Sequence, residues 1–146
     1  MSYDFILMRL SPTPRPGPIS EVVTEDAHRP IDSAATLHAA VRASPLFAPG
    51  SLRFADDRRF AWSTPDGGQI EVTVISGVVS LRMHADWVHA AALFEFARGL
   101  WPDLMLLDIQ DDEVHDPASF AAAIERNERD RAASGARAAE PPDDAG

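Results

Sequence analysis

Cysteine and lysine are both missing from this chain of 146 residues. Without a thiol, the chain can form no disulfide, no cysteine-ligated zinc or iron–sulfur centre, and no thiol nucleophile. No apolar run approaches the roughly 20 residues that a membrane helix needs. The N-terminal apolar run is interrupted by Asp4 and has no basic residue before it, which is not the pattern of a signal peptide. A cytoplasmic protein without a membrane segment is therefore expected.

Positive charge is also scarce. The 13 basic residues, all arginines, are outnumbered by 23 acidic ones, so the formal net charge is −10. Most of this excess, −8, lies in residues 1–124, so the part predicted to fold is itself acidic. An acidic surface repels phosphate backbones, which argues against nucleic acid as a partner and favours a basic protein.

The clearest structural signal is a pair of alternating segments, 69–75 and 78–84, separated by Ser76-Gly77. A tight turn there aligns apolar residues on one face, in the pairs Val74–Val79, Val72–Leu81 and Ile70–Met83. It also aligns polar residues on the other face, in the pairs Glu71–Arg82 and Thr73–Ser80. Because a slip of one residue would destroy both matches, the sequence predicts an antiparallel hairpin with one buried face.

Four further segments are predicted to be strands: 2–10, 51–55, 59–63 and 104–109. Short turns are predicted to set Leu52 and Phe54 against Trp62 and Phe60, and to set Trp62 and Phe60 beside Ile70 and Val72, so that 51–84 form a meander. Residues 2–10 are apolar on both faces, which is typical of a central strand covered on both sides. Residues 11–18 hold four prolines and are predicted to be an extended connection outside the ladder. The pattern predicts an α+β fold, with a mainly antiparallel sheet of five to six strands and helices packed on one face.

Two helices are predicted from their caps and apolar stripes. Residues 33–43 follow Asp32 as N-cap, and residues 87–98 follow Asp86 as N-cap. Gly99 is predicted to end the second helix in the left-handed region of the backbone. Residues 19–29 are interpreted as a loop or a short helix.

A third helix is predicted to start at Asp116-Pro117, with aspartate as N-cap and proline at the first helical position. It becomes charged at every turn after residue 125. Residues 132–146 lack large apolar side chains, so they are predicted to be a disordered tail. The remaining residues, 1–131, are predicted to form a single α+β domain.

Six carboxylates fall within 14 residues, with no arginine among them: Asp103, Asp108, Asp111, Asp112, Glu113 and Asp116. A solvated loop would tolerate their mutual repulsion, and this is one interpretation. Docking on a basic partner is the other, because such a patch accelerates association. The predicted partner-binding residues are Asp108, Asp111, Asp112, Glu113, His115 and Asp116, with Trp101 as an exposed anchor.

A small hydrolase-like or metal-dependent enzyme is an alternative. His84, Asp86 and His89 are close enough in sequence to form an acid–base pair. Asp108 and Asp112 could ligate a divalent ion, but the EF-hand spacing is missing. We find no nucleophile elbow, phosphate loop or dinucleotide fingerprint, and we predict neither a metal nor another cofactor.

A homodimeric structural or regulatory module is the third possibility. It would associate through a sheet edge or through the outer face of the helix 87–98. Val88 and Phe96 lie outside the stripe predicted to pack on the sheet, and they either pack under a neighbouring segment or form an interaction surface.

Two stretches resemble a known group of proteins. Met1-Ser2-Tyr3-Asp4 opens an apolar strand, and residues 101–110, WPDLMLLDIQ, are followed by HDPASF at 115–120. These resemble the two ends of small bacterial proteins of unassigned function, several of which are thought to be immunity proteins that neutralise a toxin used in competition between bacteria. Ile109 departs from the proline usual in that group. The resemblance implies an immunity-type inhibitor of a toxin, and it assigns no toxin-binding residue.

Overall fold

A computed structural model describes residues 3–11, 15–31, 33–48 and 50–139, with side chains as far as residue 133. Its centre is a nine-stranded antiparallel sheet in the order β2-β9-β8-β1-β7-β6-β5-β4, with β3 paired to β1. The strands are β1 Tyr3–Leu10, β2 Gly17–Pro18, β3 His28–Arg29, β4 Leu52–Phe54, β5 Arg59–Ser63, β6 Gln69–Ile75, β7 Val78–His84, β8 Leu104–Asp108 and β9 Glu113–His115.

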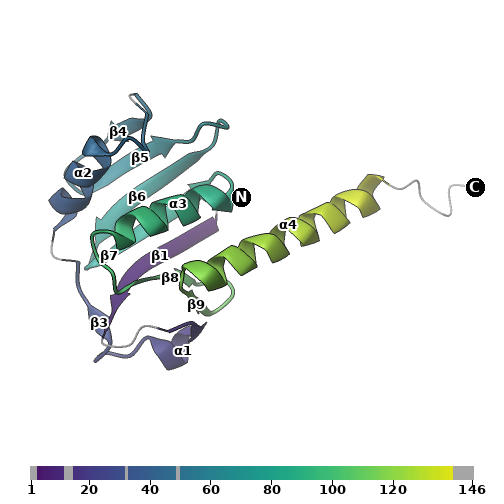
Figure 1. The fold of residues 1–146 in the computed structure, drawn as a ribbon, viewed down its shortest axis with the longest axis horizontal. Helices are drawn as coiled ribbons and strands as arrows, with labels where there is room; N and C mark the ends of the chain where they lie inside the picture. Colours follow the sequence, from purple (N-terminus) through teal and green to yellow (C-terminus); the bar gives the residue numbers. More distant parts are fainter. Residues whose placement is uncertain (1–2, 12–14, 32, 49, 140–146) are drawn as a thin grey trace, which may run out of the picture.

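Four helices accompany the sheet within the described residues: α1 Ile19–Val22, α2 Ala34–Ala43, α3 Trp87–Arg98 and α4 Pro117–Ala139. Figure 1 shows α2, α3 and α4 on one face of the sheet, with α1 near β9. The predicted fold class, α+β with helices on one face of a mainly antiparallel sheet, is confirmed. In the described part of the chain, no helix is both long and apolar enough to cross a membrane.

The predicted number of strands was too low. The three missed strands, β2, β3 and β9, have two or three residues each, which is too short for an alternating pattern to show. Pro18 in β2 pairs with Glu113, although residues 11–18 were predicted to stay outside the ladder. Because β2 is an edge strand, the missing N–H of the proline removes no ladder bond on its outer side. Residues 12–14 of that segment lie outside the described residues.

The predicted register of the β6–β7 hairpin is confirmed at every pair, as is the alignment of β5 with β4 and β6. Ser76 and Gly77 both have positive φ, 54° and 78°, which is the backbone of the two-residue turn that matches the strand twist. A Cβ on Gly77 would lie 2.9 Å from the Cβ of Pro30. The N–H of Ile31 donates to the carbonyl of Gly77 at 2.9 Å, so this turn also contacts the preceding segment.

The helix caps differ from the prediction at two positions. Ser33 caps α2, and its side chain accepts a hydrogen bond from the N–H of Thr36; Asp32, the predicted cap, lies outside the described residues. Asp86 caps α3 as predicted. Gly99 was predicted to be left-handed, which is wrong, because its φ is −63°. The chain continues in a tight right-handed turn, in which the N–H of Leu100 donates to the carbonyl of Ala97 at 3.0 Å.

Two apolar cores lie on opposite faces of the sheet. On the helix-covered face, Phe5 is fully buried and makes edge contacts with Trp87 and Phe120. On the other face, five buried side chains form a smaller cluster: Leu10, Val22, Met105, Leu107 and Val114. The segment around α1 covers only this end of the second face. The prediction that β1 is a central strand buried on both sides is therefore confirmed, while the second face of β4–β7 has no such cover.

Helix α4 is longer than the sequence predicted. It continues through residues 132–139, where a tail was expected, because alanine and arginine are strong helix formers. After Ile124, only Asn127 is partly buried among the described side chains. Arg131 lies 3.8 Å from Asp86, the N-cap of α3. Figure 1 shows this part of α4 extending beyond the sheet.

Candidate functional site

The β8–β9 hairpin, residues 108–116, contains most of the predicted partner-binding residues. Asp108 ends β8, yet it is only 2% exposed. Its carboxylate accepts hydrogen bonds from the hydroxyl of Tyr3, at 2.8 and 3.0 Å, and from the N–H of Asp111 at 3.2 Å. Burial raises the pKa of Asp108, although these hydrogen bonds act in the opposite direction. Asp108 is therefore an internal anchor of the hairpin and presents no surface to a partner.

His115 is buried as well, at 3% exposure. Its Nδ1 lies 2.9 Å from Oγ of Ser119, and its Nε2 lies 3.2 Å from Oε2 of Glu113. The ring also contacts Phe120, with centroids 5.7 Å apart. Burial lowers the pKa of His115, more strongly than Glu113 and the other nearby carboxylates raise it. The neutral imidazole thus links β9 to the first turn of α4.

Asp116 and Trp101 have structural positions. The carboxylate of Asp116 accepts the N–H of Ser119 at 2.8 Å, and Oγ of Ser119 accepts the N–H of Asp116 at 3.1 Å, a reciprocal cap of α4. Asp116 is therefore confirmed as the predicted N-cap of α4.

Trp101 is half-buried and packs against the main core, so it is not a freely exposed anchor.

The exposed part of the hairpin is smaller than the sequence predicted. Asp111 and Asp112 are exposed, and the Glu113 side chain is 45% exposed. The N–H of Ile19 donates to the carbonyl of Asp112 at 3.2 Å, so α1 lies directly against this turn and adds the exposed Glu21. We call these four residues the acidic rim: Glu21, Asp111, Asp112 and Glu113.

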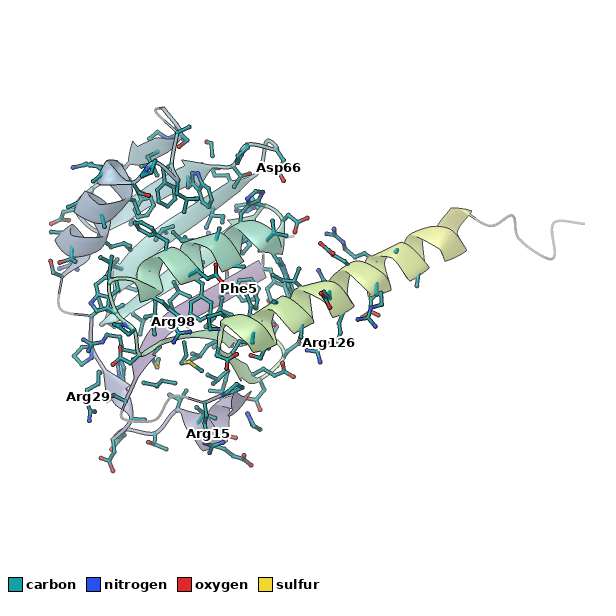
Figure 2. The ribbon with its side chains drawn as sticks, in the orientation of Figure 1. Phe5, Arg15, Arg29, Asp66, Arg98 and Arg126 are labelled. Atoms are coloured by element: carbon teal, nitrogen blue, oxygen red, sulfur yellow. The ribbon has the colours of Figure 1, made fainter. Side chains whose placement is uncertain are left out.

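A groove of about 510 Å³ runs between the acidic rim and α4. Pro16, Gly17 and Pro18 line it on one side. Ser119 and Arg126 line it from α4, and Arg126 lies 4.0 Å from Glu113. Figure 2 shows Arg126 on α4 and Arg15 beside α1, so cations border an otherwise acidic site.

Asp103, the first of the six carboxylates in residues 103–116, is also paired within the fold. Asp103 accepts hydrogen bonds from Arg9 at 2.9 and 3.3 Å. The two residues are 94 positions apart in the sequence. This pair, like the burial of Asp108, depends on contacts with β1 that no local pattern of residues 103–116 contains.

The histidines and Asp86 of the enzyme alternative do not converge on one site. His84 lies 3.4 Å from Glu71 on the open face of the sheet, and Asp86 caps α3. His89 lies 2.9 Å from Asp66. A hydrogen bond from Thr64 and the contact with His89 lower the pKa of Asp66 to about 2.

The other part of that alternative placed a metal on Asp108 and Asp112. Asp108 is already enclosed by Tyr3 and the backbone of Asp111. Over the residues that the structure describes, no three histidine, aspartate or glutamate side chains are grouped so that they could hold a metal ion.

The surfaces of the dimer alternative are partly occupied. Phe96 packs edge-on against Phe47, with centroids 5.3 Å apart, so it belongs to the core. Val88 is 43% exposed on α3. Strand β4 is one edge of the sheet and has three residues.

Two features were missed by the sequence reasoning. One is the chain of contacts from Ser119 through His115 to Glu113. The alternation of Glu113 and His115 along β9, with a helix starting at residue 117, could have indicated it. The other is a hollow of about 770 Å³ on the open face of β4–β7, lined by Arg53, Arg58, Arg59 and Arg82. Sequence reasoning could not show that this part of the face stays uncovered, because the segment around α1 packs only on its other end.

No family model matches this chain, and neither the curated proteins nor the solved structures include a significant match to it.

Proposed function

We propose that this chain is a non-catalytic protein that binds a basic protein partner through the acidic rim, in the manner of an immunity protein that neutralises a toxin. The observation that carries the proposal is the construction of the β8–β9 hairpin. Asp108 accepts hydrogen bonds from Tyr3 and from the backbone of Asp111, and α1 holds the carbonyl of Asp112. The backbone that carries the exposed carboxylates is therefore fixed before a partner arrives.

The charge distribution supports a basic partner. Asp111 and Asp112 have no ion pair within the described residues, so their charge is available to an incoming surface. A preorganised patch costs less conformational entropy on binding than a flexible loop. The formal net charge of −10 would steer a basic protein toward this molecule over a longer range. Ile109, 51% exposed at the same turn, adds an apolar contact.

The partner to test first is the protein encoded by the neighbouring gene, because immunity and toxin genes are expected to be adjacent. Association would be followed by surface plasmon resonance at several salt concentrations. We expect the association rate to fall by about tenfold or more between low and high salt. Asp111→Asn/Asp112→Asn should slow association and leave the unfolding temperature unchanged.

Asp57→Asn/Glu95→Gln is the matched control, because it removes the same charge from two exposed positions outside the rim. Equal slowing in both variants would show that net charge alone attracts the partner, and the acidic rim would lose its assigned role. Co-expression with the toxin adds a second readout, since cell survival should depend on the rim.

A second candidate function is a small hydrolase that uses Ser119. Its support is the Ser119–His115–Glu113 chain of contacts, which borders the groove of about 510 Å³. In this arrangement Oγ of Ser119 would attack an ester carbonyl and pass its proton to Nδ1 of His115, while Glu113 orients the ring. The ester C–O bond then breaks, the alcohol leaves with that proton, and water hydrolyses the acyl-serine to regenerate Ser119. The competing explanation is the cap of α4, to which the same Oγ belongs.

Hydrolysis of p-nitrophenyl acetate would separate these two roles. If the hydrolase function holds, Ser119→Ala abolishes turnover, whereas Asp116→Ala weakens the cap and leaves turnover intact. If wild-type protein shows no turnover and no labelling of Ser119 by a fluorophosphonate, Ser119 is a capping residue only.

A further inference from the structure

The open face of the sheet over β4–β7 contains a hollow of about 770 Å³, and neither of the two functions proposed above uses it. Three short side chains form its floor. Ala61 lies on β5, Thr73 on β6 and Ser80 on β7. Thr73 is the direct neighbour of Ser80 and of Arg59 in adjacent strands. Because these three small side chains lie beside long ones, this part of the sheet face is concave.

Long charged side chains surround this floor. The register places Glu71 between Ala61 and Arg82, and it places Arg53 beyond Ala61. The hollow is lined by four arginines but only two carboxylates, Asp56 and Glu71. Its formal charge is thus +2 in a chain whose total is −10.

Two of the four arginines are available for binding. Arg59 pairs with Asp56 at 2.9 Å, and Arg82 lies 3.9 Å from Asp4. The side chains of Arg53 and Arg58 make no hydrogen bond, ion pair or ring contact with any residue that the structure describes, and both are exposed. A guanidinium binds a carboxylate through two parallel hydrogen bonds, so unpaired arginines beside a concave floor favour a carboxylate ligand.

The size and chemistry of the hollow favour a protein segment as occupant. It spans four adjacent strands, from Arg53 on β4 to Arg82 on β7. Ile75, which also lines it, is 52% exposed and offers an apolar contact beside the arginines. Arginine next to apolar residues is characteristic of protein interfaces. The other half of the same face is already covered by the segment around α1, which shows that this sheet face accepts a packed chain segment.

We propose that the open face of β4–β7 binds an acidic segment of a protein partner, with Arg53 and Arg58 holding its carboxylates. The acidic rim and this face are separate surfaces of opposite charge. The inference is therefore independent of the function proposed for the rim.

The test measures the binding of a fluorescein-labelled 12-residue peptide of mixed Asp, Glu and Leu to the full chain by fluorescence anisotropy. Arg53→Gln/Arg58→Gln should raise the dissociation constant by more than about tenfold, because each variant position loses a charge-assisted contact. Arg15→Gln/Arg129→Gln is the matched control, since it removes two exposed arginines outside the hollow. The control should change the dissociation constant by less than about twofold.

Three results would overturn this inference. Equal weakening in both variants would show non-specific attraction of an acidic peptide to arginine. No binding of the wild-type chain at millimolar peptide would show that the face does not take acidic segments. A mass of twice 15.9 kDa in sedimentation that is lost in Arg53→Gln/Arg58→Gln would show that a second copy occupies the face instead. Asp111→Asn/Asp112→Asn should not weaken peptide binding. Failure of the function proposed for the acidic rim can therefore be distinguished from failure of the binding site proposed for the open face.

Discussion

The two hairpins β6–β7 and β8–β9 have the same antiparallel pairing, but different contacts hold them. In β6–β7, consecutive residues supply both the buried face and the two-residue turn. In β8–β9, the turn is held by Asp108, whose hydrogen-bond donor Tyr3 is 105 positions away in the sequence. The comparison shows that local patterns can determine a hairpin completely, whereas a hairpin held by a buried carboxylate depends on the assembled sheet.

The largest expected effect tests the locally determined hairpin. Leu81 is fully buried and lies opposite Val72. Leu81→Ala should lower the free energy of unfolding by about 2–5 kcal/mol, since it leaves a cavity in the core. Urea denaturation measures this change. Ile75→Ala, at a site 52% exposed on the same hairpin, should cost less than about 0.5 kcal/mol. Similar losses for both would contradict a one-sided hairpin.

Tyr3→Phe tests the β8–β9 hairpin, which is stabilised by a residue far away in the sequence. The variant keeps the ring contacts with Phe5 and Trp87 but leaves the Asp108 carboxylate without its hydroxyl donor. The expected loss is about 1–3 kcal/mol at neutral pH, measured by urea denaturation.

The pH dependence of this variant follows from the Asp108 pKa, which burial raises. A raised pKa means that the folded chain holds the proton more tightly than the unfolded chain. The contribution of Asp108 to stability is therefore complete at low pH and is lost as the pH rises through the folded pKa. Tyr3→Phe should raise the pKa of Asp108 further. The loss in free energy of unfolding that this substitution causes should therefore be smaller at low pH. NMR titration of the Asp108 carboxyl carbon checks the direction, and a lowered pKa would contradict it.

Gly77→Ala tests the turn between β6 and β7. The residue has a φ of 78°, and a Cβ there would lie 2.9 Å from Pro30. We expect Gly77→Ala to lower the free energy of unfolding by about 1–3 kcal/mol, measured by thermal or urea unfolding. Gly67→Ala is the matched control, because Gly67 also has a positive φ, 92°, but has open space around the added Cβ. Gly67→Ala should lower the free energy of unfolding by about 1 kcal/mol, which is the cost of the positive φ without a steric clash. Equal costs would mean that Pro30 moves aside freely.

Arg82→Glu gives the smallest effect and tests the polar face of the hairpin. Glu71 lies opposite Arg82 in the register, although its ion pair runs diagonally to His84, while Arg82 lies 3.9 Å from Asp4, its direct neighbour on β1. Two opposed carboxylates should cost about 0.2–1 kcal/mol, measured by urea denaturation. Glu71→Arg in the same molecule should restore part of the loss. No recovery would show that these charges do not contribute to the register.

The sequence alone predicted the class of the fold, the β4–β7 meander with its pairing, and the cap and length of α3, because each of these depends on residues close together in the chain. It predicted the strands of two or three residues poorly, since so few residues show no period. It placed α4 at the correct first residue but not its length, because helix propensity without large apolar anchors gives no clear end.

For the candidate site, composition identified the acidic segment but could not tell its buried members from its exposed ones. Asp108 and Asp111 are both aspartates in a polar run, yet Tyr3 encloses one and solvent surrounds the other. The arginines of the hollow lie on the polar face of the predicted β4–β7 meander, but tertiary structure decided that this part of the face stays open, because the segment around α1 covers only its other end. Local periodicity and helix caps involve only a few consecutive residues, so the elements that they determine could be predicted from the sequence. Which carboxylate loses its water, and which part of the second sheet face stays uncovered, was decided only by contacts between segments far apart in the sequence.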